Sequence, residues 1–199
     1  MKKIVLLLSL ILCSTHSHAF LSHGYNVEQL SSKANVIFMG EVAKIEESPA
    51  TNNPSDLPFV QVRFKVYESL KGNVPPVFSF KQFAPKVGKQ YQLLGMDKHA
   101  YVVGQKLVMF LGSPSQTTGL AAPQDFQLFM LQPKTNRQAD IDQSVIYNKQ
   151  LGDKIGTTLF QNLQKTNTLR LVEKMEKNQK AFTGLSYKNF RELIQASVK

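Results

Sequence analysis

The stretch that decides the fold is Val60–Val66, with the sequence VQVRFKV. Apolar and polar side chains alternate strictly along it, and this period of two is typical of a β-strand with one buried face and one wet face. Gln61, Arg63 and Lys65 are therefore expected to face water. The apolar side chains are expected to face a core: Val60, Val62, Phe64 and Val66.

Further β-rich stretches lie on both sides of this strand, each bounded by Gly, Pro or Asn. Upstream, residues 36–45 are rich in β-branched and aromatic side chains, and Gly40 among them predicts a bulge or a bend. Downstream, residues 106–111 form a continuous apolar run, which is typical of a strand buried on both faces. The remaining predicted strands are residues 77–83, 90–94, 99–103, 126–131 and 144–147.

Helical patterns occur at both ends of this strand-rich region. Asn26 and Gln29 have the spacing of a capping box and predict a short helix that ends near residue 33. From about residue 157, apolar side chains recur at helical spacing, and Ser186 is placed to cap a last helix. Short strands followed by helices predict a mainly β fold: a small OB-like β-barrel with a C-terminal helical segment, α+β overall.

The first 19 residues have the pattern of a secretory signal peptide. Lys2 and Lys3 precede a short apolar run, and the small residues Ser17 and Ala19 occupy the two positions that a signal peptidase reads. The run is too short to cross a membrane, which takes about 20 apolar residues. We therefore expect export to the periplasm or the medium, with a mature chain that begins at Phe20.

These observations divide the chain into three parts. We expect a signal peptide at residues 1–19 and an OB-like barrel domain with a short N-terminal helix at residues 20–150. Residues 151–199 are expected to form a helical segment that packs on the barrel. No later apolar stretch is long enough to be a transmembrane helix.

The composition sets the charge of the exported chain and limits its chemistry. The sequence has 24 Lys and Arg against 14 Asp and Glu. Cleavage after Ala19 removes two lysines and no acid, which leaves a formal charge of +8. The single cysteine, Cys13, lies in the signal peptide, so the mature chain has no internal disulfide and no multi-cysteine metal module. A chain this positive is attracted to anionic surfaces, and export makes nucleic acid an unexpected partner.

Three fragments of the sequence resemble a known group of proteins. They are residues 34–42 (ANVIFMGEV), residues 64–66 with 70–72 (FKV and LKG), and residues 103–111 (VGQKLVMFL). In this order they resemble a broad group of exported bacterial proteins, which is similar to the OB-type barrel of the netrin-like and tissue-inhibitor-of-metalloproteinases superfamily. The resemblance implies the barrel over about residues 27–131. The metalloproteinase inhibitors chelate the zinc of their target with an N-terminal cysteine, and the mature start expected here, Phe20, is not one.

The sequence lacks the usual signatures of catalysis. It contains no H-E-x-x-H, no G-x-S-x-G, no P-loop and no G-x-G-x-x-G. The two histidines of the mature chain, His23 and His99, have no partner motif. We therefore expect no catalytic, cofactor-binding or metal-binding residues, and no cofactor.

The sequence favours an exported, non-enzymatic binding module whose basic surface recognises a protein or an anionic glycan or lipid. Its ligand would contact Gln61, Arg63 and Lys65 on the second strand and Lys81 on the third, because OB-folds bind ligands on that face. The same cations are also expected on an ordinary strand that faces solvent and binds no ligand, where they discourage edge-to-edge pairing of sheets. Outward charges of this kind are more often ordinary than part of a ligand site.

Two other functions stay open. One is a protease inhibitor with the fold of the metalloproteinase inhibitors but without their chelating cysteine. The other is a secreted hydrolase, since glycoside hydrolysis needs only two carboxyl groups at a suitable separation. Its candidate carboxylates are dispersed along the chain: Glu41, Glu68, Asp97 and Asp125.

Overall fold

The computed structural model describes residues 25–48, 57–84, 86–87, 90–91, 101–117, 119–121, 123, 128–132, 141–148, 155–178 and 185–198. Along the chain its elements are α2 (Val27–Lys33), β1 (Val36–Ser48), β2 (Phe59–Lys71), β3 (Val77–Phe83), β4 (Lys86–Val87), β5 (Gln90–Tyr91), β6 (Lys106–Leu111), β7 (Phe129–Gln132), the 3-10 helix η3 (Ile141–Gln143), β8 (Val145–Tyr147), α3 (Ile155–Phe160), α4 (Thr166–Asn178), β9 (Leu185–Ser186) and α5 (Tyr187–Val198).

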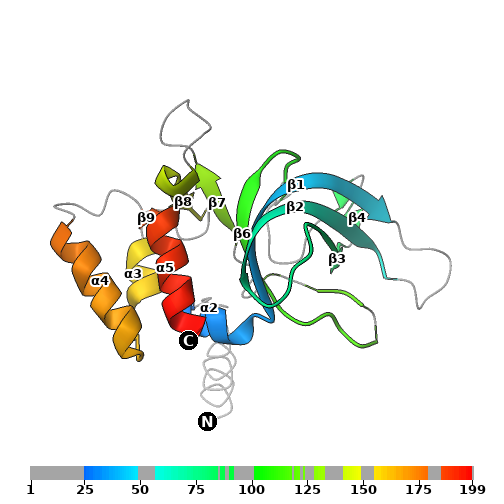
Figure 1. Ribbon diagram of the computed structural model, residues 1–199. Helices are drawn as coiled ribbons and strands as arrows, with labels where there is room; N and C mark the ends of the chain where they lie inside the picture. The colour runs from blue at the N-terminus through cyan, green and yellow to red at the C-terminus, as the bar shows by residue number, and fades with distance from the viewer. Residues whose placement is uncertain are drawn as a thin grey trace, which may run out of the picture.

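The fold is α+β, with one antiparallel sheet of seven strands in the order β3-β2-β1-β6-β7-β8-β9. Strands β4 and β5 form a separate two-stranded pair. The helices gather at one end of the molecule, and the long strands β1 and β2 curve away toward the other end, where β3 lies (Figure 1). No helix among the described residues is long and apolar enough to cross a bilayer.

The sheet is not closed into a barrel, so the predicted OB-like barrel is wrong. Strands β3 and β9 are the two edges of the sheet. Two isolated bridges, Lys81–Leu120 and Leu111–Pro123, link β3 to β6 without forming a strand. The segment that would have to close the barrel is a poor strand, because Gly119 has a φ of +67° and Pro123 has no N–H to donate.

Strands β1 and β6 lie at the centre of the sheet and bury side chains on both faces. One face, which we call the helix-side face, carries Ile37 and Met39 and packs against α2 and α5. The other, which we call the inner face, carries Phe38 and is covered by the curved β1–β2–β3 part of the sheet itself. Residues 107–111 are all buried, as the continuous apolar run of β6 predicts.

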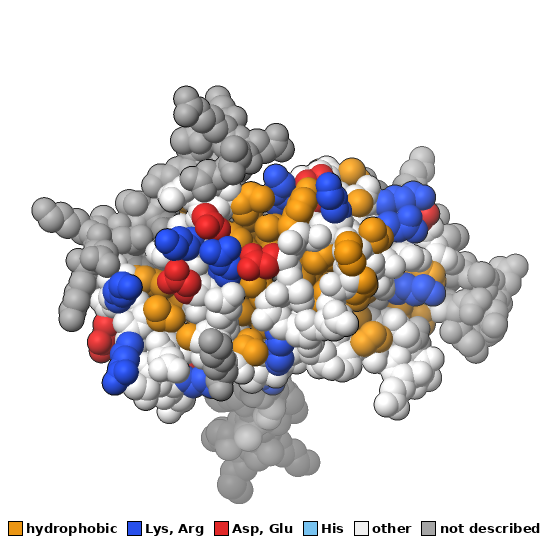
Figure 2. Space-filling view, in the orientation of Figure 1, with side chains coloured by type: hydrophobic (Ala, Val, Ile, Leu, Met, Phe, Trp, Pro, Cys, Tyr) orange, Lys and Arg blue, Asp and Glu red, His pale blue; other side chains and the backbone are white. Residues whose placement is uncertain are grey.

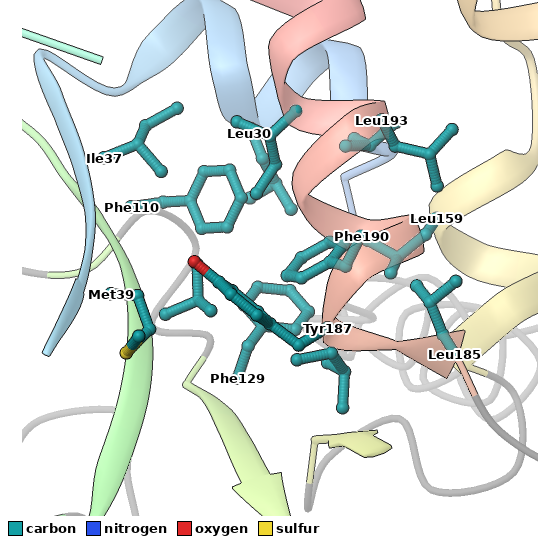
Figure 3. Close-up of a cluster of buried hydrophobic side chains, with 14 of the residues drawn as sticks. Leu30, Ile37, Met39, Phe110, Phe129, Leu159, Leu185, Tyr187, Phe190 and Leu193 are labelled. Atoms are coloured by element: carbon teal, nitrogen blue, oxygen red, sulfur yellow. The ribbon is translucent and has the colours of Figure 1, made fainter. Parts of the chain in front are cut away.

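The core on the helix-side face is built around three phenylalanine rings. The rings of Phe110, Phe129 and Phe190 have centroids 5.2–6.0 Å apart. Figure 3 shows them between Leu30 of α2 and Tyr187 at the start of α5. These contacts bury Phe190 of α5 against β6 and β7, so α5 packs on the sheet.

The predicted alternation of buried and exposed side chains along β2 is confirmed. Val60, Val62 and Phe64 are buried in the inner core, whereas Arg63 and Lys65 are exposed. The bulge expected at Gly40 is also present, as a register shift between β1 and β2 at that position. A Cβ atom on residue 40 would lie 2.9 Å from the carbonyl oxygen of Lys65, so any larger residue there would require the backbone to shift.

Both predicted helix caps are present. The Asn26 side chain accepts a hydrogen bond from the Gln29 backbone N–H, and the Gln29 side chain accepts one from Asn26, which completes the capping box. The Ser186 hydroxyl accepts from the N–H of Asn189 at 3.3 Å. The strand predicted at residues 99–103 is wrong for 101–103, because the chain turns where the Gln105 N–H donates to the carbonyl of Val102.

Candidate functional site

The helices cover only part of the helix-side face, and beyond Met39 the same face of the sheet meets solvent. Alternate residues of a strand share a face, so Glu41 lies on the same side as Met39. We call this exposed area the basic face. It consists of Glu41, Lys44 and Glu46 of β1, Gln61, Arg63 and Lys65 of β2, Val77, Ser79 and Lys81 of β3, and Lys106 of β6.

Strand register places these side chains in three rows across the sheet. The first row runs Val77, Lys65, Glu41, Lys106, the second Ser79, Arg63, Lys44, and the third Lys81, Gln61, Glu46. The four residues predicted from the sequence, Gln61, Arg63, Lys65 and Lys81, therefore lie together on one surface. Figure 2 shows Lys and Arg side chains among hydrophobic ones at the end of the molecule where β1, β2 and β3 lie, away from the helices.

The acidic side chains of β1 neutralise part of the basic face. The Lys44 ammonium group lies 2.6 Å from a carboxylate oxygen of Glu46, and the Arg63 guanidinium lies 3.7 Å from the other. The hydrogen bond and charge of Lys44 lower the pKa of the Glu46 carboxyl, with a smaller contribution from Arg63. Arg63 is consequently shared between this ion pair and solvent, since 44% of its side chain is exposed.

Lys65 and Lys81 differ from Arg63, because no described carboxylate lies within ion-pair distance of either one. Each rests instead on an aromatic ring of β2. The Lys65 ammonium lies 5.3 Å from the centroid of the Tyr67 ring, and that of Lys81 lies 4.7 Å from the Phe59 ring. An aromatic ring attracts a cation by about 0.5–1 kcal/mol at an exposed site. The ammonium N–H groups that point away from the ring can still donate to an acceptor.

A network of paired charges joins the sheet to α5 at the border of the helix layer. The Tyr187 hydroxyl donates to Glu68 at 2.7 Å, and Arg191 lies 3.5 Å from Glu68 and 3.2 Å from Asp142. Burial, and then the hydrogen bond to Glu68, raise the pKa of the Tyr187 phenol. Because each charged group in this network has a partner of opposite charge, we interpret the network as structural: it links β2, η3 and α5.

The structure brings two of the four carboxylates considered for a hydrolase onto one face. Glu68 lies opposite Met39, two residues from Glu41. Each has its own partner, because the Tyr67 hydroxyl donates to Glu41 at 2.8 Å and the Glu68 carboxylate belongs to the network with Arg191. The other two candidates, Asp97 and Asp125, lie outside the described residues, as do His23 and His99.

Lys44, Glu46 and Lys106 belong to the basic face but were missed by the sequence analysis. Three register shifts between β1 and β2 hide which residues of β1 share a face with Arg63. After the shift at residues 42–44 the even-numbered residues of β1 face outward, whereas before it the odd-numbered ones do. Alternation within β2 alone could not reveal this change.

No protein-family model matches this chain, and neither does any curated protein. The candidate site therefore rests on its geometry and charge.

Proposed function

We propose that this protein is an exported binding module that holds an anionic ligand on the basic face. The proposal rests mainly on Lys65 and Lys81, which lie on either side of Arg63 on one exposed surface and have no acidic partner among the described residues. Their ammonium groups and the Arg63 guanidinium offer charge-assisted hydrogen bonds to carboxylate, sulfate or phosphate groups. Gln61 supplies a neutral donor and acceptor between them.

Two lysines away from the basic face, Lys71 and Lys165, make structural contacts instead. Lys71 donates to the carbonyl oxygens of Ser31 and Ala34 at 2.7 Å each, at the end of α2. Lys165 donates to the carbonyl of Ser197, near the end of α5. These groups satisfy helix carbonyls that have no partner within the helix. The lysines of the basic face make no such contact, which supports a role toward an outside partner.

The spacing of the cations suits an extended ligand with several negative groups. Arg63 and Lys65 are two residues apart on one strand, which separates their Cα atoms by about 7 Å. Lys81 lies opposite Gln61, two residues beyond Arg63 on the neighbouring strand. The three cations thus follow a diagonal across β2 and β3, and a single small anion would contact only part of it.

The test is binding of heparin, a sulfated glycan, to residues 20–199. We expect the affinity to fall steeply between low and physiological salt, because screened charges contribute less. The double variant Arg63→Glu, Lys65→Glu should lose most of the binding.

The matched control is Arg170→Glu, Lys174→Glu, which makes the same charge change on two exposed residues of α4, at the opposite end of the molecule (Figure 1). This variant should bind heparin nearly as well as the unmodified protein. Equal weakening by both double variants would mean that net charge alone attracts the glycan, and the proposed site would have to be abandoned.

A further inference from the structure

Strand β3 is an edge of the sheet, and its pairing with β2 shows where its backbone groups point. The Val66 N–H donates to the carbonyl of Pro76, and the Ala84 N–H donates to that of Pro58. The β2–β3 register is uniform, and in an antiparallel pair hydrogen-bonded residues alternate with non-bonded ones. Even-numbered residues of β3 therefore bond to β2, and odd-numbered residues direct N–H and C=O away from the sheet.

The outward backbone groups of three of these odd-numbered residues, Val77, Ser79 and Lys81, differ in whether they have a hydrogen-bond partner among the described residues. The Lys81 carbonyl accepts a hydrogen bond from the N–H of Ala121 at 2.7 Å. No described residue bonds to the outward N–H or C=O of Val77 or Ser79, and 64% of Val77 is exposed. Unpaired strand edges of this kind accept another strand.

We infer that the open edge of β3 binds an extended acidic peptide segment of a partner protein, which adds a strand beside Val77–Ser79. The inference rests on the proposed function and names the partner of the basic face. Side chains of the added strand that lie on the helix-side face would meet Val77, Ser79 and Lys81, with Arg63 and Lys65 one strand further in. Acidic residues belong at those positions.

The other face of the added strand would meet a different environment. Phe78 and Phe80 point to the inner face, and both belong to the inner core. Phe78 is only half-buried, so an apolar side chain of the ligand can cover it further. The predicted ligand is therefore an extended peptide in which acidic and apolar residues alternate.

A second copy of this chain fits the edge less well. Antiparallel pairing of two β3 strands about Ser79 would place Lys81 of each copy opposite Val77 of the other, with no acid opposite either lysine. It would also bring two basic faces together, and like charges at short range repel. An acidic partner avoids both penalties.

The test uses a short capped peptide of alternating Glu and Val, titrated into residues 20–199 at low salt, with a Lys and Val peptide as its control. The decisive variant is Ser79→Pro, because it removes an N–H that points to the open edge and leaves the β2–β3 hydrogen bonds in place. We expect at least tenfold weaker peptide binding by Ser79→Pro and nearly unchanged binding by the matched control Ser79→Ala. If Ser79→Pro does not fold, Val77→Pro replaces it in the same titration, because it removes the outward N–H of Val77.

Heparin binding separates this inference from the proposed function. Ser79→Pro keeps the side chains proposed to contact heparin, which are Gln61, Arg63, Lys65 and Lys81, so it should bind heparin like the unmodified protein. If heparin binds but the Glu and Val peptide does not, or if Ser79→Pro and Ser79→Ala bind the peptide equally, the strand-addition inference is overturned and the basic face remains. Dimerisation that Ser79→Pro abolishes would overturn it in favour of self-pairing.

Discussion

The inner core should depend strongly on Phe64. Its side chain is fully buried, and its ring packs against Phe38, Phe80 and Tyr101 with centroids 5.3, 6.0 and 6.3 Å away. Replacement by alanine removes these contacts and leaves a cavity at the point where β1, β2 and β3 meet. Core Phe→Ala changes cost about 3–5 kcal/mol of unfolding free energy, and we expect Phe64→Ala to lie in this range.

Urea denaturation measures this loss. With a denaturant slope of about 2 kcal/mol per molar, a loss of about 4 kcal/mol lowers the unfolding midpoint by roughly 2 M. The control is Arg63→Ala, one residue away, whose side chain is 44% exposed and 3.7 Å from Glu46. We expect it to cost about 0.5 kcal/mol, since exposed ion pairs contribute little. Where Phe64→Ala does not fold, Phe64→Leu gives an intermediate loss of about 1 kcal/mol.

Equal losses for Phe64→Ala and Arg63→Ala would refute the reasoning. They would mean that residues 63 and 64 do not lie on opposite faces of β2, and the placement of Arg63 and Lys65 on an exposed face would fail with it.

Three further outcomes are expected. The pKa of Tyr187 is raised by burial and by Glu68, so stability should be full below the ordinary phenol pKa of about 10 and fall as the pH rises above it; urea melts at increasing pH measure this, and Tyr187→Phe together with Tyr101→Phe should flatten the decline. Gly40→Ala should cost about 1–3 kcal/mol in the same melts, because its Cβ would lie 2.9 Å from the Lys65 carbonyl oxygen and β2 must move. Intact-mass measurement of exported protein should give a chain that begins at Phe20, and a chain that retains Met1 would contradict the expected signal peptide.

Features that depend on neighbouring residues in the sequence could be predicted. The period of two in β2 identified Phe64 as buried and Arg63 as exposed, and the spacing of Asn26 and Gln29 identified the capping box. The period of two in β2 also predicted that Gln61, Arg63 and Lys65 share a face. Lys81 joins them because the uniform β2–β3 register places it opposite Gln61.

Features that depend on distant residues could not be predicted. Glu28 lies on a short helix, where a charged residue is usually exposed, yet it is only 8% exposed. Its two carboxylate oxygens accept the backbone N–H groups of Gln164 and Lys165 at 2.8 Å each, more than 130 residues further along the chain. Closure of a sheet into a barrel also depends on contacts between distant residues. The order of short strands in the sequence therefore could not show that the sheet remains open.

The central claim is that an anionic ligand binds to the exposed face of β1, β2 and β3. The most direct measurement is the change in backbone amide chemical shifts when a heparin oligosaccharide is titrated into residues 20–199. We expect the largest changes at residues 61–65 and 79–81, with small changes in α4. Largest changes in α4 and α5, or changes spread evenly over all exposed lysines, would contradict the account.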